Sequence, residues 1–228
     1  MELIEQLEKI MFLELSTPIS FSELRYKFPQ INTIIWDLDG TIANSEPMHM
    51  RAIWSAIENH QGKIKTSYSF DDLCHDSIGL NDRSIFESLL NKKIISKPIN
   101  FQDFLDLKID LFHEELKSTY PNEIIDLKIQ NLIKNFKENS ALKQALVTNS
   151  DRKSCLNVLK KLEIDDCFDF IITLDDMKNP KPDPEGYNHI QKLLQNEWEN
   201  TFIFEDSQAG LQAAQKTPAN VVKVNWYN

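Results

Sequence analysis

The second half of the chain alternates between short apolar runs and amphipathic helical patterns, and this alternation constrains the fold most. Apolar runs typical of buried strands lie at 144–148, 168–172, 201–204 and 221–224. A helical pattern precedes each run, at 122–137, 152–162, 185–194 and 208–215. Such alternation predicts an α/β fold: right-handed β-α-β units that form a doubly wound parallel sheet with helices on both faces.

A further strand pattern lies much earlier, at 33–41. Ile34, Ile35 and Trp36 run directly into Asp37-Leu38-Asp39-Gly40-Thr41. On an ideal strand the two acids point the same way and repel each other, so a positive partner is needed, and a divalent cation is the obvious candidate. The alternative is an ordinary strand that ends in a solvated Asp-Gly turn.

Between these strands, residues 46–118 have helical patterns and no convincing strand. Pro47 fits the first turn of a helix that continues to about residue 59, and a long amphipathic helix is expected at 101–118. Two shorter helices are expected, one capped by Asp71 and one by Asn81 or Asp82. The sequence therefore predicts a helical insert at 46–118 in a core made of 31–45 and 119–228.

Residues 1–30 are expected to form a helical extension. Apolar residues recur there at helical spacing, namely Leu3, Ile4, Leu7, Ile10 and Met11. Ser20 and Glu23 form a capping box for a second short helix, which Pro29 stops. We expect the apolar stripe to pack on the protein's own core, with docking of a partner as the alternative.

Composition excludes some classes of partner. The 228 residues carry a formal net charge of -10, which argues against nucleic acid and anionic membranes as partners. The three cysteines lack metal-ligand spacing and indicate reduced thiols in a cytoplasmic protein. Neither a signal peptide nor a run of about 18 apolar residues is recognisable, so we expect no membrane span.

Polar residues follow several of the predicted strands. One strand ends in Thr148-Asn149-Ser150 and another in Glu205-Asp206-Ser207, and Lys181 lies between two prolines in a loop. Because parallel strands end at the same edge of a sheet, these side chains are expected to converge with Asp37 and Asp39. Carboxylates without nearby His or Cys suit Mg²⁺, whereas Thr148, Asn149 and Lys181 suit phosphate oxygens.

In this order, these segments resemble the motifs of the haloacid dehalogenase superfamily of aspartate-nucleophile phosphotransferases. The resemblance covers roughly residues 33–224, and it implies that Asp37 attacks phosphorus while Asp39 acts as acid and base. It further implies that Thr148 and Lys181 hold phosphoryl oxygens, with Gly40, Thr41 and Asn149 beside the substrate. Mg²⁺ would be bound by Asp37, the Asp39 carbonyl, Glu205 and Asp206. Asp39 argues against a dehalogenase, because dehalogenases proper lack this second acid.

The insert resembles the small cap of the branch that includes β-phosphoglucomutase, phosphoglycolate phosphatase and sugar-phosphate phosphatases. The resemblance implies that His49 and Lys108 contact substrate and that Gly79 begins a substrate-facing loop. The alternative for Lys108 is a solvated lysine on an amphipathic helix. Asp82 stands where β-phosphoglucomutase carries an arginine that grips a second phosphate, although Arg83 is adjacent.

The expected function is a Mg²⁺-dependent phosphatase of a small, sugar-phosphate-like metabolite. A β-phosphoglucomutase-like mutase is the first alternative, and a non-catalytic protein that binds a partner through the N-terminal helices is the second. We expect a monomer, with a dimer as the alternative. Because specificity in such enzymes resides in individual cap side chains, the sequence does not name the phosphate ester.

Overall fold

The computed structural model describes residues 12–61, 67–78, 80–95, 99–195 and 197–227. The chain divides into two compact units. Unit 1 contains the described residues up to Asn44 and those from Tyr120 onward, and unit 2 contains those in Ser45–Thr119. Unit 2 is thus built from the segment in which the sequence predicts a helical insert.

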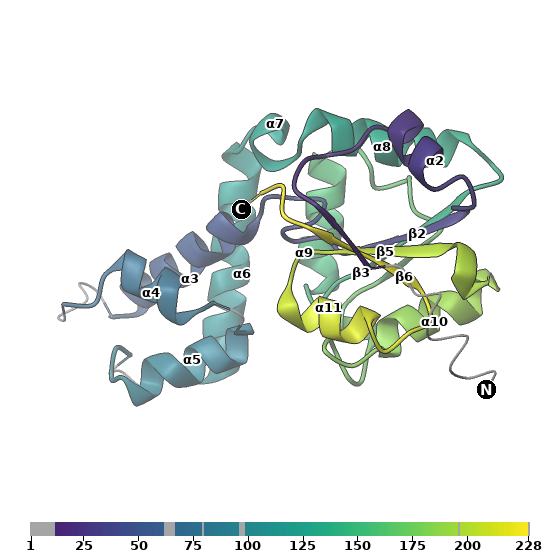
Figure 1. Ribbon diagram of the computed structural model, residues 1–228. Coiled ribbons are helices and arrows are strands. Elements are labelled where there is room, and N and C mark those ends of the chain that lie inside the picture. The colour runs from purple at the N-terminus through teal and green to yellow at the C-terminus, as the bar shows by residue number, and fades with distance from the viewer. Residues whose placement is uncertain (1–11, 62–66, 79, 96–98, 196, 228) are drawn as a thin grey trace. The chain divides into compact units, whose positions relative to one another are not determined.

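Unit 1 is built on a six-stranded, entirely parallel sheet. Its order is β1-β6-β5-β2-β3-β4 (Figure 1). The strands are β1 (Phe12–Leu15), β2 (Thr33–Trp36), β3 (Lys143–Val147), β4 (Phe170–Ile172), β5 (Thr201–Glu205) and β6 (Asn220–Val224). The predicted α/β fold with a parallel sheet is confirmed, and all strands end at one edge. β2 lies between β3 and β5, where Ile35 is opposite both Ala145 and Ile203.

Helices cover both faces of the sheet. The helices of unit 1 are α2 (Phe21–Lys27), α7 (Pro121–Ile124), α8 (Leu127–Glu138), α9 (Arg152–Lys161), α10 (Glu185–Leu194) and α11 (Gln208–Ala214), with short 3₁₀ turns at Leu174–Asp176 and Trp198–Asn200. Figure 1 shows α2 and α8 over one face and α10 and α11 over the other. Tyr187 and Leu211 of the latter pair join Ile35, Val147 and Ile203 in one buried apolar cluster.

The N-terminal segment differs from the helical extension that the sequence predicts. Residues 12–15 form β1, which pairs with β6 so that Leu13 is opposite Val222. The helical prediction is wrong here because Phe12–Leu15 alternates between more and less exposed side chains, the period of an edge strand. The Ser20–Glu23 capping box of α2 is confirmed. The apolar stripe of Leu3 to Met11 lies outside the described residues.

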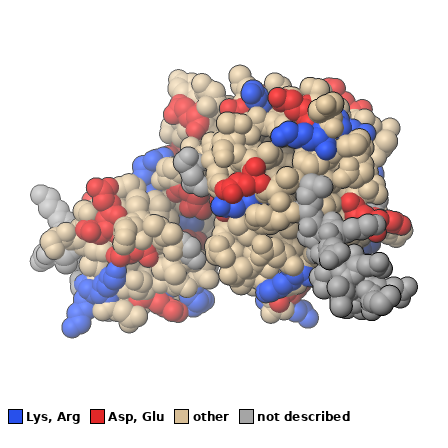
Figure 2. Space-filling model, in the orientation of Figure 1, with Lys and Arg blue, Asp and Glu red and all other residues tan. Residues whose placement is uncertain are grey.

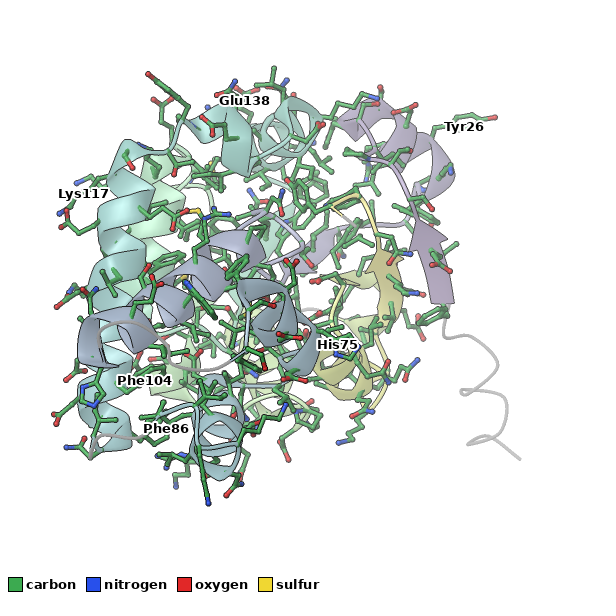
Figure 3. All side chains as sticks on the ribbon, turned by 90° about the vertical axis from the view of Figure 1, so that its left-hand side faces the viewer. Tyr26, His75, Phe86, Phe104, Lys117 and Glu138 are labelled. Carbon is green, nitrogen blue, oxygen red and sulfur yellow. The ribbon has the colours of Figure 1, made fainter. Side chains whose placement is uncertain are left out.

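The described part of unit 2 is helical. Its helices are α3 (Glu46–Gln61), α4 (Phe70–Asp76), α5 (Asp82–Asn91) and α6 (Phe101–Ser118). Asn81 caps α5 by accepting from the Ser84 N–H at 2.9 Å, whereas Ser69, and not Asp71, caps α4. Phe86 and Phe104, labelled in Figure 3, lie with ring centroids 5.1 Å apart in the buried core of this unit.

The surface shows no membrane-spanning feature among the described helices. None of them combines the length and the apolar character that crossing a bilayer requires. On the face shown in Figure 2, acidic and basic side chains are interspersed. Among the charged side chains of unit 1, Lys143 pairs with Asp169 at 3.0 Å and Lys223 with Glu14 at 3.0 Å.

Candidate active site

Asp37 follows β2 directly, at the central position of the sheet edge. Its N–H donates to the Phe204 carbonyl oxygen at 3.0 Å, which extends the β2–β5 ladder by one residue. The side chain is buried, with 6% of the residue exposed. The backbone ladder therefore fixes where this carboxylate lies, at the carboxyl end of a fully buried strand.

Lys181 occupies the centre of the acidic cluster. Its ammonium nitrogen donates to Asp37 Oδ1 at 2.6 Å, to Glu205 Oε1 at 2.5 Å and to the Val147 carbonyl oxygen at 2.7 Å. An ammonium has three N–H donors, and all three are used here. The predicted convergence of Asp37, Lys181 and Glu205, which are far apart in the sequence, is thus seen in the structure.

The charges in this cluster shift one another's pKa values. Burial and the nearby Glu205 carboxylate raise the pKa of Asp37, against the opposing effect of the Lys181 ammonium. Burial alone would lower the pKa of Lys181, but the Asp37 and Glu205 carboxylates outweigh it and raise that pKa. Lys181 is therefore a permanent cation within a set of carboxylates that repel one another.

Glu205 is held by four hydrogen bonds. Besides Lys181, the Tyr187 hydroxyl donates to Oε1 at 3.0 Å, and the N–H and hydroxyl of Ser207 each donate to Oε2 at 3.1 Å. A Cβ atom added at Gly210 would overlap this carboxylate. The Tyr187 contact is not predicted from the sequence, although a tyrosine on the buried face of the helix that follows the Lys181 loop is a signal that could have indicated it.

Asp39 and Asp206 have hydroxyl partners of their own. The Ser150 hydroxyl donates to Asp39 Oδ2, and the Thr41 hydroxyl donates to Asp206 Oδ1 at 2.8 Å. Gly40 makes the turn directly after Asp39 with φ = +84°, and a Cβ atom there would overlap the Asp206 carboxylate. The two acids of the first motif therefore have different environments: Asp37 contacts a cation and Asp39 contacts a hydroxyl.

Thr148 and Asn149 lie at the end of β3, as predicted, but their side chains contact the backbone. The Thr148 hydroxyl oxygen accepts from the Ser150 N–H at 3.0 Å. The Asn149 side chain donates to the Lys181 carbonyl oxygen at 3.1 Å and accepts from the Lys181 N–H at 3.0 Å. Asn149 therefore holds the Lys181 loop against the end of β3.

The acids form a cluster that suits a hard cation. Asp37, Glu205 and Asp206 offer ligand atoms that all lie within 4.8 Å of one another. Carboxylate oxygens are the ligands that Mg²⁺ prefers, and a cation would relieve the repulsion that raises the Asp37 pKa. The donor set thus fits Mg²⁺, although Glu205 already accepts four hydrogen bonds.

The residues predicted to bind substrate from the insert all belong to unit 2. His49 stacks on Phe112, with ring centroids 4.2 Å apart. Lys108 is buried and pairs with Asp82 at 3.0 Å, so the alternative of a solvated lysine is wrong. Gly79 lies outside the described residues.

Carboxylates and a buried lysine converge at the carboxyl edge of the parallel sheet. This arrangement is typical of α/β hydrolytic enzymes whose active site is built from acidic side chains. The sequence places the chain within that class. It belongs to the haloacid dehalogenase-like hydrolase family, whose sequence model matches residues 34–224. The family resemblance drawn from the motifs is therefore confirmed.

Known relatives agree with this assignment. A phosphorylated carbohydrates phosphatase of Thermotoga maritima is 28% identical over 184 residues, which cover 81% of this chain and 80% of the relative. The structure of β-phosphoglucomutase from Clostridium difficile is 26% identical, with a TM-score of 0.68 and coverage of 85% and 84%. CbbY from Rhodobacter sphaeroides, solved in complex with phosphate, is 22% identical, with a TM-score of 0.70 and coverage of 87% and 88%.

Proposed function

We propose that the protein is a Mg²⁺-dependent phosphatase of a small phosphorylated metabolite, such as a sugar phosphate. The proposal rests on the different partners of the two acids in the first motif: Asp37 contacts Lys181, whereas Asp39 contacts Ser150. Carboxylates with different environments can perform different roles in one reaction. The relative that dephosphorylates phosphorylated carbohydrates supports the same substrate class.

Asp37 is the proposed nucleophile and Asp39 the proposed acid and base. An Asp37 oxygen forms a bond to phosphorus while the ester P–O bond breaks, and Asp39 gives its proton to the leaving alcohol oxygen. Asp39 then takes a proton from water as the water oxygen attacks phosphorus. The bond between Asp37 and phosphorus breaks, which releases inorganic phosphate and restores both carboxyl groups.

Two further groups serve the phosphoryl oxygens in this proposal. Lys181 would exchange one of its present carboxylate bonds for a phosphoryl oxygen, and the Thr148 hydroxyl would donate to another. Gly40 and Thr41 are proposed to lie beside the substrate, with the Gly40 N–H already donating to the Ala43 carbonyl oxygen at 2.7 Å. Asn149 is proposed to act indirectly, by positioning Lys181, because its side chain is hydrogen-bonded to both the N–H and the carbonyl oxygen of that residue.

Mg²⁺ would be held by Asp37, the Asp39 carbonyl oxygen and Asp206, with Glu205 beside them. When bound, the ion offsets the repulsion between the anionic carboxylates and an anionic phosphate. Because Glu205 accepts four hydrogen bonds, we assign it mainly to holding Lys181 and Ser207 in position. The sequence suggests that Glu205 is a metal ligand; in this proposal its main role is to position its hydrogen-bond partners.

Similarity to β-phosphoglucomutase makes a mutase the second candidate, but charges in unit 2 favour the phosphatase. A mutase must hold both phosphates of a bisphosphate intermediate. Lys108 is neutralised by Asp82 at 3.0 Å, and the Arg83 guanidinium lies 4.2 Å from the centre of the Phe101 ring. Arg83, the candidate for gripping a second phosphate, and Lys108, expected to contact substrate, are thus both engaged within unit 2, which supports a monophosphate ester as substrate.

The deciding experiment is a panel of phosphate esters, including p-nitrophenyl phosphate and sugar monophosphates, assayed with Mg²⁺ at pH 7. We expect release of inorganic phosphate, which Asp37→Asn abolishes because an amide cannot form the acyl phosphate. Asp165→Asn, at an exposed acid of unit 1, is the matched control and retains activity. Failure to hydrolyse any ester would reject the phosphatase, and conversion of glucose 1-phosphate that requires a bisphosphate would favour the mutase.

A further inference from the structure

The last two described residues bond to consecutive carbonyl groups in the turn after Asp39. The indole N–H of Trp226 donates to the Thr41 carbonyl oxygen at 2.8 Å. The hydroxyl of Tyr227 donates to the Ile42 carbonyl oxygen at 2.9 Å. We call Trp226 and Tyr227 the C-terminal strap; they follow β6 and lie close to the turn, although they are far from it in sequence.

The turn depends on donors from outside itself. Three of its own N–H groups are used internally: Gly40 donates to Ala43 O at 2.7 Å, and Ile42 and Ala43 each donate to Leu38 O at 2.9 Å. Thr41 and Ile42 are fully buried. A buried carbonyl without a donor is destabilising, so the strap supplies bonds that these carbonyls need.

The strap is itself anchored in unit 1. The Tyr227 hydroxyl oxygen accepts from the Asp126 N–H at 3.1 Å, and Asp126 caps α8. The Trp226 ring lies 6.4 Å from the ring of Phe204, two residues before Asp206 on the same chain segment. The strap therefore connects the turn to the start of α8 and to the strand that leads to the acid pair.

The turn also orients one carboxylate of the acidic cluster. The Thr41 hydroxyl donates to Asp206 Oδ1 at 2.8 Å, and Gly40 packs closely against the same carboxylate. We propose that Trp226 and Tyr227 are positioning residues: by holding the Thr41 and Ile42 carbonyls, they keep the Thr41 hydroxyl on Asp206 and thereby preorganise the cluster for Mg²⁺. The inference rests on the proposed function, in which Asp206 is a metal ligand.

The test removes each donor and keeps the aromatic ring, with Trp226→Phe and Tyr227→Phe. Isothermal titration of the full chain with Mg²⁺, without substrate, is expected to show a dissociation constant weakened by about 3- to 10-fold in each variant, the equivalent of one hydrogen bond. Amide hydrogen exchange is expected to become faster in a peptide that covers residues 38–44, and to stay unchanged in β3 and β4.

Two variants serve as controls. Tyr26 is 89% exposed and points away from the protein in Figure 3, so Tyr26→Phe removes a tyrosine hydroxyl without touching the turn. Trp198 packs against the core cluster of the α10 and α11 face, so Trp198→Phe reports the effect of a general loss of packing. Neither control is expected to change Mg²⁺ affinity or exchange in the turn.

The outcomes separate the inference from the proposed function. If both strap variants bind Mg²⁺ as tightly as the parent chain, or if exchange rises uniformly over the molecule, the positioning role is overturned. A parent chain that binds no Mg²⁺ overturns it as well, because Asp206 is then no metal ligand. A chain that binds Mg²⁺ in a strap-dependent way but hydrolyses no ester supports the inference and rejects the phosphatase.

Discussion

The ammonium nitrogen of Lys181 lies 2.6 Å from Oδ1 of Asp37, and both side chains are almost completely buried. Buried charges are tolerated when they are paired and hydrogen-bonded, and here one cation serves Asp37 and Glu205 together. The site therefore carries its own positive charge at the residue proposed to attack phosphorus. The same arrangement makes Lys181 important for folding as well as for the proposed chemistry.

Replacing Lys181 with methionine should destabilise the protein strongly. Lys181→Met leaves the buried Asp37 and Glu205 carboxylates without their cation, and breaking a buried pair by removing one partner costs roughly 3–5 kcal/mol. Urea unfolding monitored by tryptophan fluorescence measures this loss. Lys192→Met, at an exposed lysine of α10, should change stability by no more than about 0.5 kcal/mol. A Lys181→Met protein as stable as that control would show that the cluster does not need the cation.

Removing the Ser150 hydroxyl should slow catalysis with little change in substrate binding. Ser150 donates to Asp39, the proposed acid and base, so Ser150→Ala leaves that carboxyl less well oriented. Loss of one such bond is expected to lower kcat by about 10-fold and to leave KM nearly unchanged. Ser150→Thr keeps a hydroxyl and should recover most of the rate. Equal kcat values for Ser150→Ala and the parent would argue that Asp39 is positioned by other groups.

The sequence predicts which residues meet at the sheet edge better than it predicts how they bond to one another. The buried strand before Asp37 and the polar residues after 144–148 and 201–204 are local patterns, and a parallel sheet brings their ends together. By contrast, Tyr187 and Ser150 reach Glu205 and Asp39 through contacts between distant segments. No periodicity or short motif encodes which hydroxyl meets which carboxylate.

Two other elements differ from the sequence-based prediction, again because of contacts that the local pattern does not encode. Phe12–Leu15 becomes a strand because β6 offers a free edge for parallel pairing, so tertiary structure overrides the expectation of a helix. The single helix expected at 122–137 is divided into α7 and α8, because Asp126 caps α8 by accepting from the Lys128 N–H at 2.7 Å. The aromatic residues after β6 have no local pattern that would predict their bonds to the turn.

Acid should reduce the contribution of the Arg152–Asp176 pair to stability. Burial would raise the pKa of Asp176, but bonds from Arg152 and Thr173 outweigh it and lower that pKa below its ordinary value. A lowered pKa in the folded state stabilises the protein above the unfolded pKa of about 3.9, and this stability disappears as pH falls through the folded value. Asp176→Asn should therefore unfold at a lower temperature than the parent at pH 6, and the difference should shrink below about pH 4.

Solvent limits how much the Arg152–Asp176 pair contributes to the free energy of unfolding. The Arg152 side chain is 46% exposed, so screening holds the pair to about 1 kcal/mol or less, which corresponds to about 2–4 °C in Tm. Thermal unfolding followed by circular dichroism between pH 3 and pH 6 provides the measurement. A difference in Tm that stays constant over this range would mean that the Asp176 carboxylate contributes through packing and not through its charge.

Gly210→Ala tests whether the Glu205 carboxylate is fixed in place, because two effects oppose each other there. Alanine is favoured over glycine inside a helix by about 1 kcal/mol, so α11 alone would be stabilised. The added Cβ atom, however, would overlap Glu205, whose carboxylate is bonded to Lys181, Tyr187 and Ser207. Displacing a buried group in a packed site costs about 1–3 kcal/mol, so we expect net destabilisation together with a loss of activity.

The control for this substitution is Gln212→Ala, at an exposed position of the same helix, which should be neutral or slightly stabilising. Combining Gly210→Ala with Glu205→Ala, which removes the overlapping carboxylate, gives a second comparison. If the clash with a rigid carboxylate causes the loss, the two substitutions interact, and the double variant is less destabilised than the sum of the single ones. Additive free energies of unfolding, or a Gly210→Ala protein more stable than its parent, would mean that Glu205 moves aside easily. Its four hydrogen bonds would then not be what holds Lys181 next to Asp37.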